Sequence, residues 1–179
     1  MPKPLRVRYS RIQREVDSLL AKHNAYGPPI DVKGIAESEG AEISYERLED
    51  DLCGFLVPGK PNFIIGVNRW HHDNRQRFTI AHELGHYFLH DFDDVHVDRS
   101  FRLRSPISAK AVDIEEIEAN TFAAWILIPE RMLLSDIRNS GIDLQDDGRI
   151  MELARRYEVS QQSMSFRLLN LASRRGAIF

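Results

Sequence analysis

One stretch, residues 78–91, reads Phe78-Thr79-Ile80-Ala81-His82-Glu83-Leu84-Gly85-His86-Tyr87-Phe88-Leu89-His90-Asp91 and contains the pattern H-E-x-x-H within an apolar segment of helical length. Residues four apart lie on one face of a helix, so His82 and His86 can direct two imidazole nitrogens at one metal ion. Two such nitrogens suit tetrahedral Zn²⁺. Glu83 follows the first histidine and is placed to accept a proton from metal-activated water. The stretch predicts a metal-dependent hydrolase.

The surroundings of this pattern argue against a chance match on a surface helix with two solvated histidines. Apolar residues recur at helical spacing, at Phe78, Ala81, Leu84, Phe88 and Leu89. This spacing predicts a packed helix. Gly85 costs about 1 kcal/mol relative to alanine in a helix, and its place between the two histidines suggests that another part of the chain approaches the backbone there.

A catalytic zinc site with two histidines needs a third protein ligand, and a carboxylate would complete a two-histidine, one-glutamate set. The acidic candidates downstream are Asp113, Glu115, Glu116 and Glu118, on or near a helix expected from about 112 to 128. Glu116 is favoured because Asn120 follows one turn later on the same face. There the amide can orient a ligating histidine. Glu115 and Glu118 are expected to meet solvent or another partner.

Two stretches together resemble the ImmA/IrrE family of metallo-endopeptidases: residues 75–87, Arg75-Gln-Arg-Phe-Thr-Ile-Ala-His-Glu-Leu-Gly-His-Tyr, and residues 116–129, Glu116-Ile-Glu-Ala-Asn-Thr-Phe-Ala-Ala-Trp-Ile-Leu-Ile-Pro. The resemblance covers roughly residues 10–172. It implies that His82, His86 and Glu116 bind the metal and that Glu83 is the catalytic base. Members of this family cut helix-turn-helix transcriptional repressors of mobile elements or stress regulons. In the family, the second motif usually ends in Leu-Leu-Met-Pro, whereas this sequence has Ile126-Leu-Ile-Pro129. We expect this difference to affect side-chain packing only.

The rest of the first 140 residues predicts a scaffold around this helix. Apolar spacing predicts a helix around residues 12–20, and Asp31 and Gly40 are placed to begin and end a second one. Residues 42–49 alternate, and the apolar runs 54–57 and 63–67 flank the turn Pro58-Gly-Lys-Pro-Asn62, which predicts a small three-stranded antiparallel meander with a hairpin. Residues 91–111 are expected to be irregular and to form a rim of the active site.

Four further histidines lie near the predicted metal helix. His71, His72 and His90 are each expected to be solvated rather than to bind metal. His96 is a weak candidate for donating a hydrogen bond to the oxyanion of the reaction.

The end of the chain predicts a helical part of its own. Leu153 to Ser160 followed by Gln161 to Leu171 has the pattern of helix, tight turn and helix, with Ser160 as the N-cap of the second helix. It resembles the helix-turn-helix-like part that follows the protease core in the family. A packing module is favoured over a DNA-binding role.

Composition limits the other function classes. The 179 residues carry a net charge of −3, which gives no overall attraction to nucleic acid. Arginines nonetheless gather near the end: Arg149, Arg155, Arg156, Arg167, Arg174 and Arg175. The single cysteine, Cys53, excludes an internal disulfide, and the sequence contains no apolar run long enough for a signal peptide or a membrane span. We expect a cytoplasmic protein.

The sequence therefore predicts an α+β fold: a zincin-like metallopeptidase core with a small antiparallel sheet in residues 1–140, then a helix-turn-helix-like part in residues 141–179. The expected cofactor is Zn²⁺, although Mn²⁺ or Fe²⁺ would also suit these ligands. The expected substrate is a helix-turn-helix repressor. The alternative is a DNA-associated regulator or antitoxin-type partner with a structural or vestigial metal. A structural site would have a fourth protein ligand in place of water.

Overall fold

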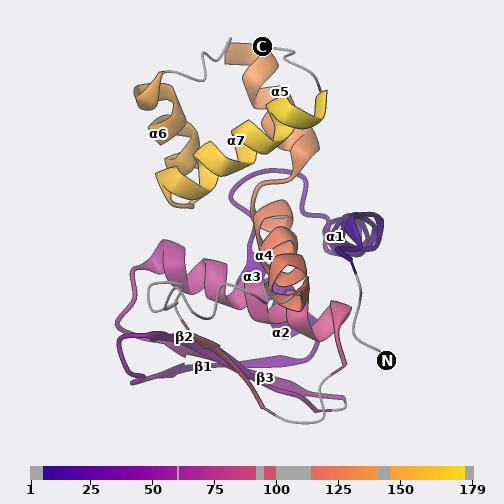
Figure 1. Cartoon of the computed structure of the whole chain (residues 1–179), viewed down its shortest axis with the longest axis vertical. Helices are drawn as coiled ribbons and strands as arrows, with labels where there is room; N and C mark the ends of the chain where they lie inside the picture. The colour runs from indigo at the N-terminus through magenta and orange to yellow at the C-terminus, as the bar shows by residue number, and fades with distance from the viewer. Residues whose placement is uncertain (1–5, 60, 92–94, 100–113, 141–145, 176–179) are drawn as a thin grey trace.

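Helix α3 (Asp73–Leu89) is the central element of the computed structural model, which describes residues 6–59, 61–91, 95–99, 114–140 and 146–175. It lies on one face of the sheet and is crossed by α4 (Ile114–Leu127), as Figure 1 shows. Every residue from Thr79 to His86 is buried. The packed helix predicted around the H-E-x-x-H pattern is confirmed.

The sheet contains β1 (Ala41–Glu46), β2 (Leu52–Val57), β3 (Phe63–Asn68) and β4 (His96–Arg99), in the spatial order β1-β3-β2-β4. The predicted β2–β3 hairpin is confirmed, since the two strands are antiparallel. The predicted meander is wrong, because β1 runs parallel to β3 rather than pairing with β2. Strand β3 buries Phe63, Ile65 and Val67 and takes an interior position, whereas the more polar β1 lies at an edge. The sheet is therefore mixed.

Strand β4 lies in a region that was expected to be irregular. It pairs antiparallel with β2, and His96 is opposite Leu56. Most of the predicted active-site rim, including residues 92–94 and 100–113, lies outside the described residues.

Two N-terminal helices complete the core beside α3 and α4. Helix α1 (Tyr9–Lys22) buries the expected apolar stripe Ile12, Val16, Leu19 and Leu20. Helix α2 (Val32–Ser38) is capped by Asp31, whose side chain accepts a hydrogen bond from the Gly34 amide. Gly40 follows it with a φ of +97°, a left-handed conformation that favours glycine. Both predicted helices are confirmed.

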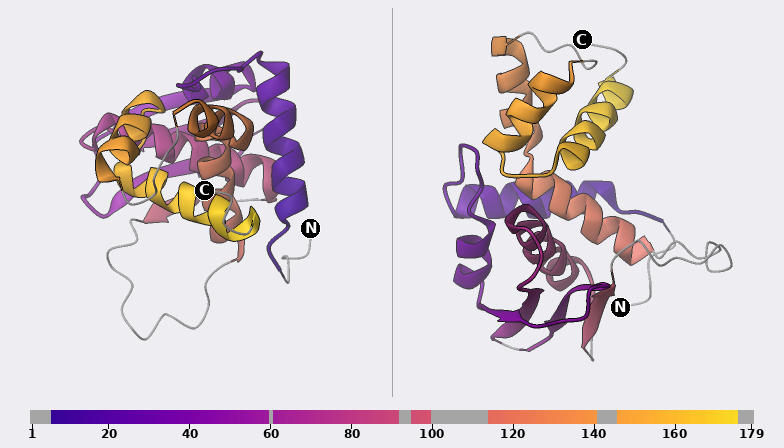
Figure 2. Two further views of the ribbon diagram at one scale, coloured as in Figure 1. Left: turned by 90° about the horizontal axis from the view of Figure 1, so that it is seen from above. Right: turned by 90° about the vertical axis from the view of Figure 1, so that its left-hand side faces the viewer.

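The C-terminal helices α5 (Glu130–Ser140), α6 (Asp147–Arg156) and α7 (Gln161–Arg175) gather at the end of the molecule away from the sheet (Figure 2). The predicted helix, turn and helix is confirmed, and the Ser160 hydroxyl accepts a hydrogen bond from the Ser163 amide. Buried side chains of these helices are continuous with the core. A domain boundary at 140/141 stays a prediction. Among the described helices, none has the length and apolar character needed to cross a membrane.

The side chain of Phe122 on α4 packs directly against the α3 backbone at Gly85. A Cβ built on Gly85 would lie 3.0–3.1 Å from three carbon atoms of the Phe122 side chain. Phe122 is fully buried, so its ring has little room to move. Glycine therefore allows the helix that carries Glu116 to approach the helix that carries the histidines.

We expect Gly85→Ala to lower the free energy of unfolding. Overpacking against Phe122 should cost about 1–3 kcal/mol, which exceeds the gain of up to about 1 kcal/mol in helix propensity. Urea denaturation measures the change. Gly27→Ala is the control, because a Cβ at Gly27 meets nothing within 4 Å. In a Phe122→Leu background the cost of Gly85→Ala should shrink, and an equal cost there would show that the two positions are not coupled.

Candidate metal centre

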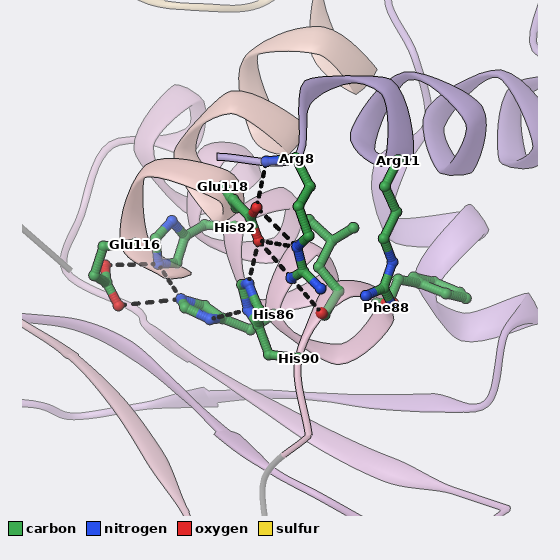
Figure 3. Close-up of polar contacts among 9 residues, drawn as sticks. Arg8, Arg11, His82, His86, Phe88, His90, Glu116 and Glu118 are labelled. Atoms are coloured by element: carbon green, nitrogen blue, oxygen red, sulfur yellow. Dashed lines mark hydrogen bonds and ion pairs between the residues drawn. The ribbon is translucent and has the colours of Figure 1, made fainter. Parts of the chain in front are cut away.

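Three predicted ligands meet between α3 and α4. His82 Nε2 lies 3.0 Å from His86 Nε2. Glu116 reaches both histidines from α4, with Oε2 3.5 Å from His82 Nε2 and Oε1 3.2 Å from His86 Nε2 (Figure 3). The two imidazoles are almost fully buried, and Glu116 is partly exposed. The helix spacing of four residues therefore brings the nitrogens together as predicted.

These three side chains suit a metal ion in both spacing and chemistry. Zinc bonds of about 2.0–2.1 Å place tetrahedral ligand atoms about 3.3 Å apart. The separations of 3.0, 3.5 and 3.2 Å lie close to that value. His96 approaches the same group, since its Nε2 lies 3.3 Å from Glu116 Oε1. Among the described residues, His82, His86, His96 and Glu116 form one group that could hold a metal.

Glu83 is buried beside this cluster. Its side chain has no exposed surface, and neither carboxylate oxygen accepts a hydrogen bond from the described residues. Burial raises the pKa of Glu83 well above its usual range, and the charges of Asp98 and Glu116 add to the effect. A buried carboxyl group without a partner is costly, so its retention here suits a group that exchanges a proton at a neighbouring metal.

The protonation states of the cluster favour metal binding. Burial lowers the pKa of His86 to about 3, which leaves the imidazole neutral. Burial alone would raise the pKa of Glu116, but hydrogen bonds from His86 and His96 outweigh it and lower that pKa. A neutral imidazole and an ionised carboxylate are the forms that bind a metal.

Asn120 contacts the first histidine from the predicted position. Its Oδ1 lies 3.2 Å from His82 Nδ1, one helical turn beyond Glu116. If Nδ1 carries the proton it donates to this oxygen and leaves Nε2 available for a metal. The local spacing on α4 therefore predicted both the carboxylate and the amide that contact the histidines.

The second histidine is held by a chain of contacts that sequence reasoning missed. His86 Nδ1 lies 3.1 Å from His90 Nδ1, and His90 Nε2 lies 3.0 Å from Glu118 Oε2. The expectation that His90 is at the surface is wrong, because its side chain is 1% exposed. The spacing His82, His86, His90 along one helix face was the signal that could have revealed it.

This series of contacts ends at Glu118, which forms an ion pair with Arg8, the residue just before α1. Arg8 Nη2 donates to Glu118 Oε2 at 2.6 Å, and the Arg8 backbone amide donates to Oε1 at 2.6 Å (Figure 3). Arg8 also donates to the Leu89 carbonyl at the end of α3. Glu118 was expected to meet solvent or another partner, and that partner is thus an arginine 110 positions away in the sequence.

The remaining residues near the start of α3 support the fold. His72 is the N-cap of α3 and accepts a hydrogen bond from the Asn74 amide, and His71 is partly buried rather than solvated. Arg77 forms an ion pair with Glu158 at 3.3 Å. Neither His71 nor His72 belongs to a metal-binding group among the described residues.

Comparisons with known proteins agree with this geometry. Residues 36–169 match the Peptidase_M78 family, described as the IrrE N-terminal-like domain. The "Uncharacterized immunity region protein 2" of Bacillus phage phi105 is 28% identical over 161 residues, which cover 86% of this chain and 92% of that protein. The "Radiation response metalloprotease IrrE" of Deinococcus radiodurans is 34% identical over 107 residues, 59% of this chain and 30% of that protein. The similarity therefore spans less than a third of the Deinococcus protein.

The Glu118 network predicts loss of stability in acid. Burial raises the pKa of Glu118, but hydrogen bonds from Arg8 and His90 outweigh it and lower the pKa from 4.5 to about 2. Because the pKa is lowered on folding, the stabilisation is complete above about pH 4.5 and is lost as the pH falls toward about 2. Glu118→Gln should lower the free energy of unfolding by about 3 kcal/mol at pH 7. It should also make that free energy less dependent on pH in this acid range.

Urea unfolding at several pH values measures this effect. Glu152→Gln is the control, because Glu152 pairs with Arg149 at the surface with 69% of its side chain exposed. It should change the unfolding free energy by less than about 1 kcal/mol. Equal pH profiles for the wild type and Glu118→Gln would contradict the prediction.

Proposed function

Since this chain belongs to the peptidase family of the IrrE N-terminal-like domain, we propose that it is a zinc-dependent endopeptidase that cleaves a helix-turn-helix transcriptional repressor and so relieves repression. The observation that carries the proposal is the buried Glu83 beside the His82, His86 and Glu116 cluster. The names of the two relatives, an immunity region protein of a phage and a radiation response metalloprotease, support a regulatory substrate.

The residues divide the chemistry between them. His82, His86 and Glu116 would hold the metal, and Asn120 would orient His82. Bound zinc would supply a Lewis acid for the scissile carbonyl and lower the pKa of a coordinated water toward about 7. Glu83 would take the proton of the attacking water and pass it to the leaving amine nitrogen. Its raised pKa suits a group that must hold this proton between the two steps.

The relatives and the sheet support the proposed substrate class. Strand β4 lies at one edge of the sheet, and His96 and Asp98 on it both approach the metal cluster. Peptidases commonly hold a substrate in extended form along such an edge. We therefore infer that an extended, accessible segment of a repressor would bind along this edge.

The alternative is a DNA-associated regulator or antitoxin-type partner with a structural metal. His96 favours it, because a fourth protein ligand is typical of structural sites. The charge of the C-terminal helices does not support it. Arg167 is 3% exposed and donates to the Ile128 carbonyl, so it does not offer its guanidinium to a phosphate. The exposed side chains of α7 include Phe166 and Leu169, which are apolar. DNA contact is therefore not favoured.

Substitutions of Glu83 and the ligands test the proposal. We expect purified wild-type protein to contain about one zinc per chain by elemental mass spectrometry. His82→Ala and Glu116→Ala should lose it, and Glu83→Gln should keep it. Incubated with the repressor encoded nearest to its gene, the wild type should produce defined fragments, and Glu83→Gln should produce none. A Glu83→Gln variant that still cleaves would exclude Glu83 as the base.

The Asn120 contact has a separate test. Asn120→Ala should weaken zinc binding about 10–100-fold, because His82 loses the group that orients it. Competition with a chromophoric chelator measures this affinity. The control is Asn24→Ala. Asn24 lies just beyond α1, far from Asn120 in the sequence, and its replacement should leave the zinc affinity unchanged. If Asn120→Ala also leaves it unchanged, Asn120 has no role in positioning His82.

A further inference from the structure

His96, the first residue of β4, lies among the expected metal ligands. Its Nε2 is 3.3 Å from Glu116 Oε1, and its ring centroid is 4.0 Å from that of His86. One ligand atom from each of His82, His86, His96 and Glu116 lies within 4.8 Å of the others. A tetrahedral zinc site needs four donors with separations of about 3.3 Å, and His96 is placed where a fourth donor could lie.

The strand explains why His96 points at the cluster. Side chains alternate along a strand, so His96 and Asp98 lie on one face of β4 and Val97 on the other. Val97 is 47% exposed, whereas Asp98 joins His82 and Glu83 in a second close group. Pairing with β2 fixes this register, with His96 opposite Leu56 and Asp98 opposite Gly54. Both ligand-type side chains of β4 therefore face the metal helix.

We propose that His96 is a fourth metal ligand that closes the site in the absence of substrate. With His96 bound, all four tetrahedral positions are occupied by protein, and no position is open for the water that Glu83 would activate. Cleavage then requires that His96 leave the metal. The effect of His96 on cleavage rests on the proposed peptidase function. The role of His96 as a ligand can be tested without any cleavage.

The four ligands differ in how firmly the fold holds them. His82 and His86 lie in the buried middle of α3, and both have hydrogen-bonded neighbours at Nδ1. His96 belongs to a four-residue strand at the sheet edge, whose pairing with β2 contains a register shift. Short edge strands with exposed side chains are the least stable part of a sheet. His96 is therefore the ligand that an incoming extended peptide can most readily displace.

Zinc affinity provides the first test. Competition with a chromophoric chelator should show at least about tenfold weaker zinc binding in His96→Ala than in the wild type. His96→Gln, which keeps a polar side chain of similar size, should show the same loss. Val97→Ala is the control, because it alters the same strand on the face away from the metal. Unchanged zinc affinity in both His96 variants would overturn the proposal and leave His96 as an oxyanion donor at most.

The cobalt-substituted protein tests whether the site is closed. Acetohydroxamate, a small metal-binding probe, is titrated while the visible absorption of Co²⁺ is followed. The probe should bind His96→Ala at least about tenfold more tightly than the wild type, because in the wild type it must first displace His96. Val97→Ala should behave like the wild type. Equal binding to the wild type and His96→Ala would mean that the site is already open and would overturn the proposal.

These outcomes are separate from those of the proposed function. A closed site in wild type together with no repressor cleavage would keep His96 as a ligand and would indicate a structural metal. An open site together with cleavage that depends on Glu83 would keep the peptidase and reject His96 as a ligand.

Discussion

The structure depends on the burial of ionisable side chains between α3 and α4. His82, Glu83 and His86 lie in the buried middle of α3, where an unpaired polar group costs several kcal/mol. The neighbours of the two histidines come from three other elements: Glu116 and Asn120 from α4, His96 from β4, and, through His90 and Glu118, Arg8 just before α1. The need to satisfy these groups fixes how the helices and the edge strand are placed around α3.

Local spacing was enough to predict part of this arrangement. The α3 helix, Glu116 and Asn120 follow from residues four apart on a helix, a relation that is visible in the sequence. The contacts that were missed join distant segments. Arg8 and Glu118 are 110 positions apart, and no local pattern links them. The position of β1 next to β3 was missed for a similar reason, because strand order depends on which strand buries most apolar surface, and consecutive strands were assumed to pair.

The C-terminal helices show why a count of charges is a poor guide to a binding surface. Arginines gather near the end of the sequence, yet several of them are engaged within the protein. Arg156 pairs with Asp136, Arg149 pairs with Glu152, and Arg167 lies over the ring of Trp125. Arginine stems and guanidinium planes cover apolar and aromatic surface as well as carrying charge. Arg156 joins α6 to α5 and Arg167 joins α7 to the end of α4, whereas the Arg149 pair lies within α6.

The contact between Arg8 and Glu118 sets a limit on aminopeptidase trimming of the chain. Both the backbone amide and the guanidinium of Arg8 donate to this one buried carboxylate. Trimming that stops at Arg8 would turn the amide into a terminal ammonium, which is still a donor and adds positive charge. Removal of one more residue would take away both donors and leave a buried negative charge uncompensated. Loss of Arg8 would therefore reach His86 through Glu118 and His90.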